Sequence, residues 1–548
     1  MKQLTKLGML LTIGALAVSC SNDNKVDNPN NTIDPDYNGK AYMSVSIAMP
    51  NTDYSRAASY VDGEEEEYAA TSGTVYLFKR AATGEADYTY VTKGTISQPL
   101  WEMSSDNQVT TNSKTAVAEF TGFEAGLDTD SQDEYSILVV LNDNLTAPTA
   151  PQGSNDGQKF GDWKLVPQSN VLGNLTNGLT MTNAPEFKNG SVKTLVDIDK
   201  SKISTSPTNL SPAATVYVQR IAAKVSIGES DEAKRKNNTL ADFKVELPEG
   251  ADPGTTPDHV KFSHWDINYY NTTSYPVQVA DDYQSWLTAG TGTTANDQGT
   301  LGRYLNPTGN FGRIHWGYDP NYVSVSKADN NHNTTDALSV INGVNTDNVI
   351  TKTVTYINEN TMEYNKQQYD QTTTVVLKGT YHIENSDQED SFVTYGAWRS
   401  KIPDSLKEKL TATTGAKNTS LVGLFEGAEE DEVLEAFGLT SDVNVNYYHE
   451  GVVYYSIQIR HFDDLETPKP VPMVGISSYL PSHRGRYGVL RNNWYEVNVN
   501  SITGLGDPSL PDPDDPDDPT PDDDPDKQYI QVTINILKWA KRSYDYDL

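Results

Sequence analysis

The pattern of apolar and polar positions predicts a β-strand near the amino end of the chain. In "AYMSVSIAMP" small residues alternate with larger apolar ones. The apolar positions are Met43, Val45, Ile47 and Met49. A repeat of two places these side chains on one face, which is typical of a half-buried strand. Pro50 follows and ends the predicted strand.

Similar short apolar runs recur along most of the chain. They include "GTVYLFKR", "TAVAEFTGF", "EYSILVVLND", "FKVELP", "DHVKFSHWDIN", "DQTTTVVLKGTYHI", "EGVVYYSIQIRHF" and "NNWYEVNVNSITGLG". A period of 3.6 residues is confined to short pieces such as "DSLKEKL" and "EEDEVLEAFG". Many short strands separated by Gly, Pro and Asn predict an all-β protein, built as two antiparallel β-sandwiches with irregular insertions.

One strongly apolar stretch, "ATVYVQRIAAKVSI", marks the border between two predicted domains. Its alternation slips, so it either closes the first sandwich or opens the second. A chain of 548 residues with 36% hydrophobic content is long enough for more than one core. We expect an amino-terminal domain at 57–214 and a carboxyl-terminal domain at 215–506. A stretch from about 281 to 347, rich in Thr, Gly and Asn, is predicted to form long loops.

The carboxyl end combines a stiff tether with one apolar strand. The predicted tether, 507–527, is rich in proline and aspartate, which extend a chain by stiffness and mutual repulsion. In the final segment, 528–548, aliphatic side chains alternate with polar ones at Ile530, Val532, Ile534 and Ile536. Burying all four is worth roughly 6–12 kcal/mol, at about 1.5–3 kcal/mol each. The strand has three possible acceptors: the chain's own sheet, a neighbouring subunit or a separate partner.

The first twenty residues are predicted to be a targeting segment that takes no part in the fold. Lysines precede an apolar run that is too short for a stable membrane anchor, and small residues precede Cys20. Cys20 is the only cysteine, so it cannot form an internal disulfide. Its position after "LAVS" resembles a bacterial lipobox, whose cysteine is acylated, for example with palmitate. The alternative is an ordinary signal peptide with an incidental cysteine.

A polar segment between the first strand and "GTVYLFKR" contains a candidate processing point. Arg56 and Ala57 lie there among small and polar residues, in what we expect to be an exposed loop. A trypsin-like protease would reach the bond between them. The alternative is a solvated loop arginine without such a role.

Composition and motif content favour a protein that is not an enzyme. The 75 acidic and 42 basic residues give a net charge of −33, which disfavours binding to nucleic acid. No GxxxxGK[ST], GxSxG, HExxH or CxxC motif is present, and the eight histidines are scattered. The run "DTDSQDE", which begins at Asp128, lacks ligands of a complete calcium loop. We therefore predict no catalytic, cofactor or metal site.

Several stretches spread over the chain carry a family likeness. The most specific is "RNNWYEV…DPDDP…LKWAKRSYDYDL" at the carboxyl end. The likeness extends to the lipobox and to "YMSVSIAMP", "YSILVVLND", "VQRIAAKV" and "INENT…TTTVVLKGTY", whereas the loops between them do not match closely. With these stretches the chain resembles the type V fimbrillins of Bacteroidales, and among them the major, stalk-forming subunit of the minor fimbriae.

The resemblance implies Greek-key, transthyretin-like sandwiches and assembly by donor-strand exchange. In that family an arginine-specific protease removes the first strand of a lipoprotein precursor and leaves an open groove. By position, the bond after Arg56 matches the cleavage point, so the propeptide is 21–56 and includes the first strand. The donor strand of a second copy would then fill the groove. Its implied residues are Ile530, Val532, Ile534, Ile536, Leu537 and Trp539.

The resemblance also implies partners and a location. The partners are other copies in a head-to-tail filament, anchor and tip subunits, the processing protease, and receptors on host or bacterial surfaces. No cofactor is implied, and the membrane is contacted only through the lipid of the precursor. The precursor would lie at the cell outer membrane and the mature protein in an extracellular fimbria used for adhesion.

A monomeric, surface glycan-binding lipoprotein is the alternative function. It would share Cys20, the acidic spacer and the sandwiches. Its sugar-stacking residues would be drawn from Trp265, Trp286, Trp316 and Trp398. A monomeric binder has no use for a tethered terminal strand, which favours the fimbrial interpretation.

Overall fold

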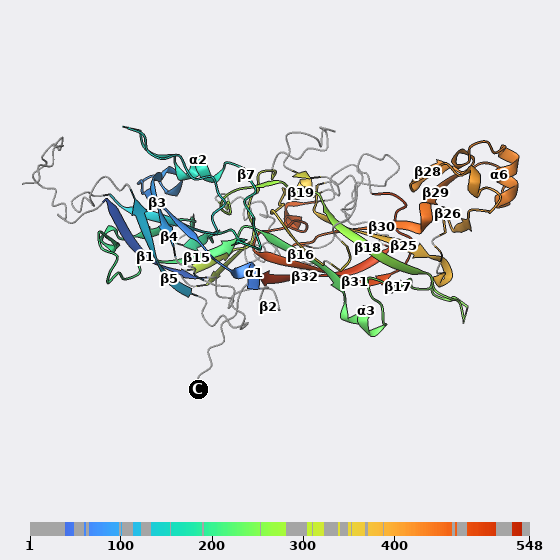
Figure 1. Ribbon diagram of the computed structural model, residues 1–548, viewed down its shortest axis with the longest axis horizontal. Helices are drawn as coiled ribbons and strands as arrows, with labels where there is room; N and C mark the ends of the chain where they lie inside the picture. The colour runs from blue at the N-terminus through green and yellow to red at the C-terminus, as the bar shows by residue number, and fades with distance from the viewer. Residues whose placement is uncertain are drawn as a thin grey trace, which may run out of the picture.

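The computed structural model shows an elongated molecule (Figure 1). The amino-terminal strands lie at one end, and the later strands fill the middle and the other end. The described residues are 39–48, 60–61, 65–97, 100, 113–121, 133–153, 155–188, 191–252, 254–280, 304–308, 311–322, 338–339, 349–351, 353–367, 371–386, 388, 390–462, 466–467, 479–510 and 529–539.

The amino-terminal half is a sheet that closes on itself. Its hydrogen-bonded order is β10-β15-β1-β5-β4-β3-β6-β13, and β10 also pairs with β6. The strands from β10 to β6 therefore form a ring, which we call the amino-terminal barrel, while β13 and β14 attach at β6 and β1. The bounds are β1 Lys40–Ala48, β3 Gly73–Lys79, β4 Thr89–Ile96, β5 Ser113–Thr121, β6 Tyr135–Leu141, β10 Met181–Asn183, β13 Val196–Ile198, β14 Ile203–Ser204 and β15 Thr215–Arg220.

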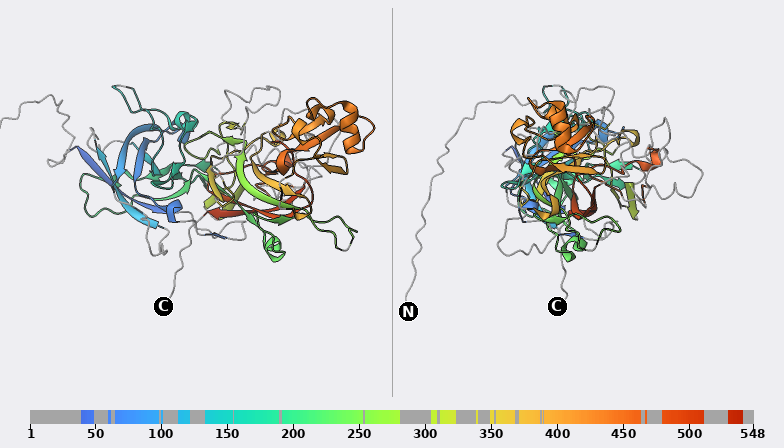
Figure 2. Two further views of the ribbon diagram at one scale, coloured as in Figure 1. Left: turned by 45° about the vertical axis from the view of Figure 1, so that its right-hand side comes forward. Right: turned by 90° about the vertical axis from the view of Figure 1, so that its right-hand side faces the viewer.

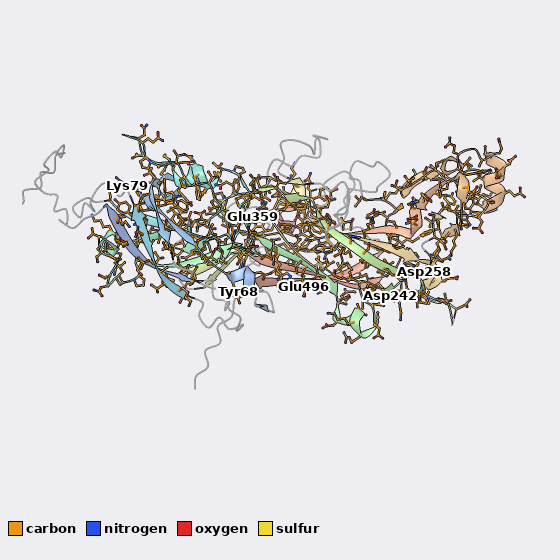
Figure 3. All side chains as sticks on the ribbon, viewed as in Figure 1. Tyr68, Lys79, Asp242, Asp258, Glu359 and Glu496 are labelled. Carbon is orange, nitrogen blue, oxygen red and sulfur yellow. The ribbon has the colours of Figure 1, made fainter. Side chains whose placement is uncertain are left out.

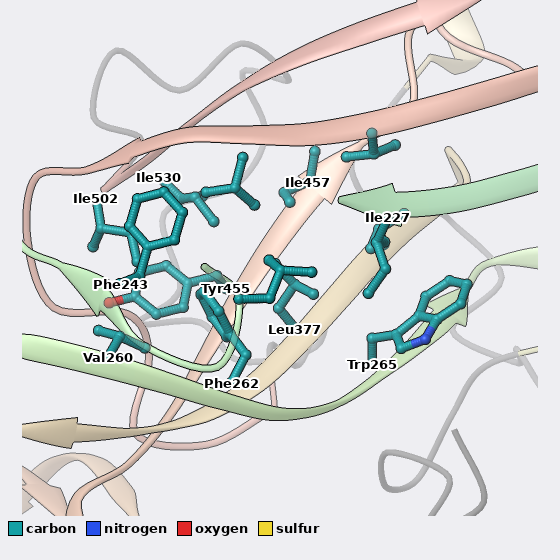
Figure 4. Close-up of a cluster of buried hydrophobic side chains, with 14 of the residues drawn as sticks. Ile227, Phe243, Val260, Phe262, Trp265, Leu377, Tyr455, Ile457, Ile502 and Ile530 are labelled. Atoms are coloured by element: carbon teal, nitrogen blue, oxygen red, sulfur yellow. The ribbon is translucent and has the colours of Figure 1, made fainter. Parts of the chain in front are cut away.

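The carboxyl-terminal half is a sandwich of two sheets. Their orders are β2-β32-β31-β16-β24 and β17-β18-β25-β30. The bounds are β2 Tyr60–Val61, β16 Ala223–Glu229, β17 Phe243–Lys244, β18 His259–Asn268, β24 Val354–Ile357, β25 Thr374–His382, β30 Val452–Gln458, β31 Asn493–Ile502 and β32 Ile530–Trp539. Side chains from both sheets form one core, in which Ile227 and Ile502 face Phe262, Leu377 and Ile457 (Figure 4).

A small unit is inserted between β25 and β30, and we call it the inserted subdomain (residues 390–448). It comprises β26 Phe392–Tyr395, β27 Trp398–Lys401, β28 Ala416–Ser420, α6 Glu430–Phe437 and β29 Asn444–Tyr448. It has its own core, which includes Val393, Leu421 and Val433. Figures 1 and 2 show the subdomain at the end of the molecule opposite the amino-terminal barrel.

The remaining elements are short. The helices are α1 Glu65–Tyr68, α2 Phe160–Lys164, α3 Asp231–Arg235 and the 3-10 turns Glu85–Asp87, Lys200–Lys202, Tyr364–Lys366, Ile383–Asn385, Lys407–Lys409, Val422–Leu424, His449–Gly451 and Pro481–His483. The strands are β7 Gln168–Ser169, β8 Gly173–Asn174, β9 Gly178–Leu179, β11 Glu186–Lys188, β12 Ser191–Lys193, β19 Tyr270–Asn271, β20 Thr273–Ser274, β21 Leu305–Thr308, β22 Phe311–Ile314 and β23 Leu338–Ser339. Within the described ranges, no helix has both the length and the apolar character that crossing a membrane requires.

The all-β fold class is confirmed by these elements. The sheets differ from the prediction in that they are not purely antiparallel, because β1 pairs with β15 and β16 pairs with β31 in parallel. The run "EEDEVLEAFG" forms α6, which ends at Gly438 with a φ of 68°. That left-handed conformation favours glycine. In "DSLKEKL" only the turn Lys407–Lys409 is helical.

The stretch "ATVYVQRIAAKVSI" joins the two halves. It forms two strands: β15 lies in the amino-terminal barrel, and β16 lies in the carboxyl-terminal sandwich. The sequence left open whether this stretch closes one unit or opens the next, and it does both. The helix α1 lies beside this junction, where Figure 3 labels Tyr68.

A buried group of charges holds α1 at the junction. The Glu67 carboxylate lies 2.6 Å from Lys224 Nζ and accepts a hydrogen bond from the Tyr356 hydroxyl at 2.5 Å. Arg220 Nε donates to the Glu67 carbonyl at 2.7 Å, and Lys224 Nζ lies 3.7 Å from the centre of the Trp494 ring. Because these contacts join α1, the barrel and the sandwich, they fix the two halves to each other.

The burial of Glu67 differs from the exposed loop that the sequence predicted for this segment. Glu67 is 0% exposed and Lys224 is 1% exposed. An acidic run normally lies in water, but a paired carboxylate can be buried when its charge and hydrogen bonds are satisfied. The partner lies far along the chain, and therefore local sequence gives no sign of it.

We expect Glu67→Gln to lower the free energy of unfolding by about 3 kcal/mol, because it leaves the Lys224 ammonium buried without its counter-charge. Urea unfolding followed by circular dichroism measures the change. Glu232→Gln is the control, since Glu232 pairs with Lys236 at an exposed site, and its unfolding midpoint should match that of the parent. Equal midpoints for all three proteins would contradict the role of Glu67.

Candidate functional site

Strand β1 is an interior strand of the amino-terminal barrel. It pairs antiparallel with β5 along its whole length, from Lys40 opposite Thr121 to Ala48 opposite Ser113. Its other edge pairs with β14 at Tyr42 and Met43, and with β15 from Ser46 onward. Both edges of β1 are therefore hydrogen-bonded to the chain that follows it in the sequence.

The apolar face of β1 fills the core of the barrel. Ala41 is 1% exposed, and Met43, Val45 and Ile47 are 0% exposed. Full burial of the last three contributes roughly 5–9 kcal/mol. The opposite face is also shielded, since Ser44 is 1% exposed, so β1 is more deeply buried than the half-buried strand that its pattern predicted.

Several residues that lie opposite the apolar face of β1 are small or apolar, although Lys114 lies opposite Ile47 on β5. Val45 lies opposite Ala116, and Met43 lies opposite Ala118. On the other edge, Ile47 lies opposite Val216. The apolar residues in these pairs belong to the barrel core. Without β1, the barrel would hold an apolar gap one strand wide, bordered by unpaired backbone groups of β5 and β15.

Strand β32 lies in the sheet of its own carboxyl-terminal sandwich. It pairs antiparallel with β31, from Ile530 opposite Ile502 to Lys538 opposite Asn493. On its other edge, within the described part of the chain, only the two-residue β2 pairs with it, in parallel. Of the three acceptors that the sequence left open, this structure has the chain's own sheet.

The side chains of β32 alternate as predicted, but most of its apolar face is only partly covered. Ile530 is 3% exposed and lies in the sandwich core (Figure 4), whereas Val532 and Ile534 are partly buried against that core. Gln531 and Thr533 are exposed on the other face. The side chains of Ile536, Leu537 and Trp539 are outside the described set.

The sequence did not predict the strand that pairs with the free edge of β32. The pair Tyr60–Val61, expected in a loop, forms β2 and meets β32 at Lys538 and Trp539. An aromatic residue followed by a β-branched residue is the only local signal for such a strand. The segment that follows the predicted cleavage point therefore lies against the end of the terminal strand.

Other predicted site residues lie outside the described residues. These are Cys20, Met49, Arg56, Ala57, most of the calcium-like run from Asp128, Trp286, and the predicted tether from residue 511 to residue 527. Lipidation and proteolytic processing therefore stay predictions.

The described residues offer little for chemistry or glycan stacking. They contain no group of three or more His, Cys, Asp or Glu side chains that is arranged to hold a metal ion. Trp265 is 1% exposed and Trp316 is 0% exposed, so neither can stack on a sugar. Trp398 packs against the core of the inserted subdomain.

Comparison with solved structures finds distant likenesses over most of the chain. A fimbrilin of Porphyromonas gingivalis W83 is 11% identical, with 91% of this chain and 97% of that chain covered and a TM-score of 0.34. The tip fimbrial protein Mfa3 of Porphyromonas gingivalis, with a carboxyl-terminal truncation, is 12% identical, with coverages of 91% and 100% and a TM-score of 0.30. A Parabacteroides distasonis protein provisionally named a cell adhesion protein is 11% identical, with coverages of 90% and 96% and a TM-score of 0.36. Because all three scores lie below 0.5, we draw no conclusion from them.

The family comparison is specific to the carboxyl-terminal region. No curated protein matched the chain. Residues 446–545 match the family described as "Major fimbrial subunit protein type IV, Fimbrillin, C-terminal". This range contains β30, β31 and β32, and therefore includes the terminal strand and the strand on which it lies. Over this range the chain is therefore similar to the carboxyl-terminal region of fimbrillins.

Proposed function

We propose that this chain is a fimbrillin, a stalk-type subunit that polymerises by donor-strand exchange, with β32 of one copy replacing β1 of another. The observation that carries the proposal is the correspondence between these two strands. Each presents apolar side chains at alternate positions, but β1 completes a barrel whereas β32 lies at a less covered place beyond a long tether. A strand of this kind can be exchanged between chains without any change to the rest of either fold.

Hydrogen bonding favours the exchange once β1 has left. In its own sheet β32 has β31 along one edge, but only Tyr60 and Val61 on the other. The place of β1 offers β5 along one edge and β14 and β15 on the other. Each added backbone hydrogen bond contributes about 0.5–1.5 kcal/mol net, so the groove holds a strand more firmly than the home sheet does.

Burial acts in the same direction. The positions of Met43, Val45 and Ile47 are sealed from solvent, whereas Val532 and Ile534 are only partly covered at home. Moving aliphatic side chains from partial to complete burial is favourable by about 25 cal/mol per Å² of apolar surface. When β32 leaves, part of the sandwich core around Ile530 becomes exposed. The net free energy gained on exchange is therefore smaller than the free energy of burial in the groove alone.

Proteolysis supplies the irreversible step. We propose that a trypsin-like or arginine-specific protease hydrolyses the Arg56–Ala57 bond, which separates β1 from the rest of the chain. As long as β1 is covalently attached, it competes for the groove at a very high effective concentration. Cleavage removes that advantage, and β32 of another copy can then hold the groove.

The same proposal includes the cellular location of the precursor and the partners of the filament. A lipid on Cys20 would hold the precursor at the outer membrane, and cleavage after Arg56 would release the subunit into a growing extracellular filament. Anchor and tip subunits would bound the filament, and its adhesion would involve receptors on host or bacterial surfaces. The glycan-binding alternative has less support, because Trp265 and Trp316 are buried in cores.

We expect the precursor to polymerise after cleavage by an arginine-specific protease and to show a ladder on gels run without boiling. The Arg56→Gln precursor should remain monomeric, because β1 stays attached. A chain truncated after Asp526 should not form a ladder, but once cleaved it should shorten the ladders of the full-length protein, since it retains a groove and lacks a donor. Ladders of equal length with and without the terminal strand would refute donor exchange by β32.

Ile534→Asp should lower the polymer yield by roughly tenfold or more, because a carboxylate in an apolar groove costs several kcal/mol. The monomer should keep its circular dichroism spectrum, since Ile534 is only partly buried in the home sheet. Ile534→Val is the matched control and should polymerise like the parent. Normal ladders from Ile534→Asp would show that the aliphatic face is not the anchor.

A further inference from the structure

The chain that leads into the tether is held firmly on the sandwich, and we call residues 503–508 the arm root. The Tyr455 hydroxyl donates to the Gly504 carbonyl at 2.8 Å, and the Tyr448 hydroxyl donates to the Gly506 carbonyl at 3.1 Å. The backbone N–H of Asp507 donates to the Tyr454 carbonyl at 2.8 Å, and the Tyr454 N–H donates to the Asp507 carbonyl at the same distance.

The burial of Tyr448 strengthens its hydrogen bond to the arm root. Burial, together with the nearby Asp507 carboxylate, raises the pKa of Tyr448, so its hydroxyl remains a hydrogen-bond donor throughout the physiological pH range. Tyr448 is only 3% exposed. Its bond to the arm root is therefore shielded from competing water.

The inserted subdomain contributes a second set of contacts. Lys417 Nζ, in β28, lies 3.1 Å from the Asp507 carboxylate, and the Lys417 side chain is only 13% exposed. Gly415 lies so close to the arm root that a Cβ atom there would be 1.9 Å from the Pro508 carbonyl oxygen. Real Cβ atoms do not approach so closely, so only glycine allows this backbone contact.

None of these contacts involves β32. At home, the terminal strand is joined to the arm root through Thr503, whose N–H donates to the Tyr529 carbonyl at 2.8 Å. Departure of β32 breaks that bond, the ladder with β31 and the packing of the Tyr529 ring on Gly504, but leaves the hydrogen bonds of Gly504, Gly506 and Asp507 to the tyrosines in place. The released arm therefore starts beyond Asp507, on the inserted subdomain.

We propose that the inserted subdomain positions the donor arm, so that β32 is delivered to a second copy of the chain and not to the chain's own barrel. The inference rests on the proposed donor-strand exchange. The subdomain lies at the end of the molecule opposite β1 (Figure 1). From there, the tether between Leu510 and Tyr529 has 18 residues and a reach of about 56 Å at about 3.1 Å per residue.

The position at which the tether leaves the folded protein affects how fast β32 meets a second copy. An arm anchored where the sandwich meets the inserted subdomain starts away from its own barrel, which raises its effective concentration at a groove on a second copy. An arm that came loose at residue 503 would be longer and would sample a larger volume, including space nearer its own barrel. The arm root thus favours a head-to-tail contact over self-insertion.

Gly415→Ala tests the inference, because the added Cβ must displace the arm root. Gly423→Ala is the control in the same subdomain, where a Cβ would meet only the Ser420 side chain, at 3.2 Å. Lys417→Met, which removes a side-chain contact and leaves the backbone unchanged, serves if Gly415→Ala does not fold. Hydrogen exchange of residues 503–508 in the uncleaved protein measures how firmly the arm root is bound. Ladder length after cleavage measures how often β32 inserts into a second copy.

We expect Gly415→Ala to speed exchange at 503–508 by roughly tenfold. It should also shorten ladders by roughly threefold. More of the cleaved protein should remain monomeric, because β32 fills the groove of its own chain. The control should match the parent in both measurements. Faster exchange with unchanged ladders would overturn the positioning role, and unchanged exchange would overturn the arm root itself. Either result leaves donor exchange standing, because that step is tested separately, by the chain truncated after Asp526 and by Ile534→Asp.

Discussion

Closure of the amino-terminal barrel by β1 is the constraint on which the rest of the structure depends. Val45 and its neighbours on the apolar face are sealed inside, and both edges of the strand are hydrogen-bonded. A strand in such a place normally cannot be lost, because its departure opens a core. Under the proposed cleavage after Arg56, the loss of β1 would require a replacement strand that meets the same demands, and β32 has the same alternation of apolar positions.

The strands near the two ends of the chain, β1 and β32, differ in how deeply they are buried and in how firmly they are bound. Strand β32 is well covered at Ile530 and less covered beyond it, so its home sheet keeps it from solvent without holding it as firmly as the barrel holds β1. An exposed aliphatic strand would promote aggregation, and a strand fixed in its own sheet could not be donated. Under the proposed exchange, the partial burial of Val532 and Ile534 lies between these two extremes.

Local patterns in the sequence predicted the elements but not their neighbours. The alternation around Val45 and Ile534 predicted strands, and the apolar spacing before Gly438 predicted α6, because each depends on side chains within a few residues. The sheet that receives each strand depends on residues far away. The burial of Glu67 beside Lys224, and the docking of β32 on its own sandwich, therefore could not be read from local sequence.

The closed ring of the barrel also sets the number of connections that each subunit can make. Removing β1 leaves one gap, one strand wide, between β5 and β15, because all the other pairings of the ring stay in place. Each chain also has one tethered terminal strand. Under the proposed assembly, a subunit thus has one acceptor and one donor, a valence of two. Units of valence two can form lines or closed loops but cannot branch, so the linear form of the polymer follows from the connectivity of a single sheet.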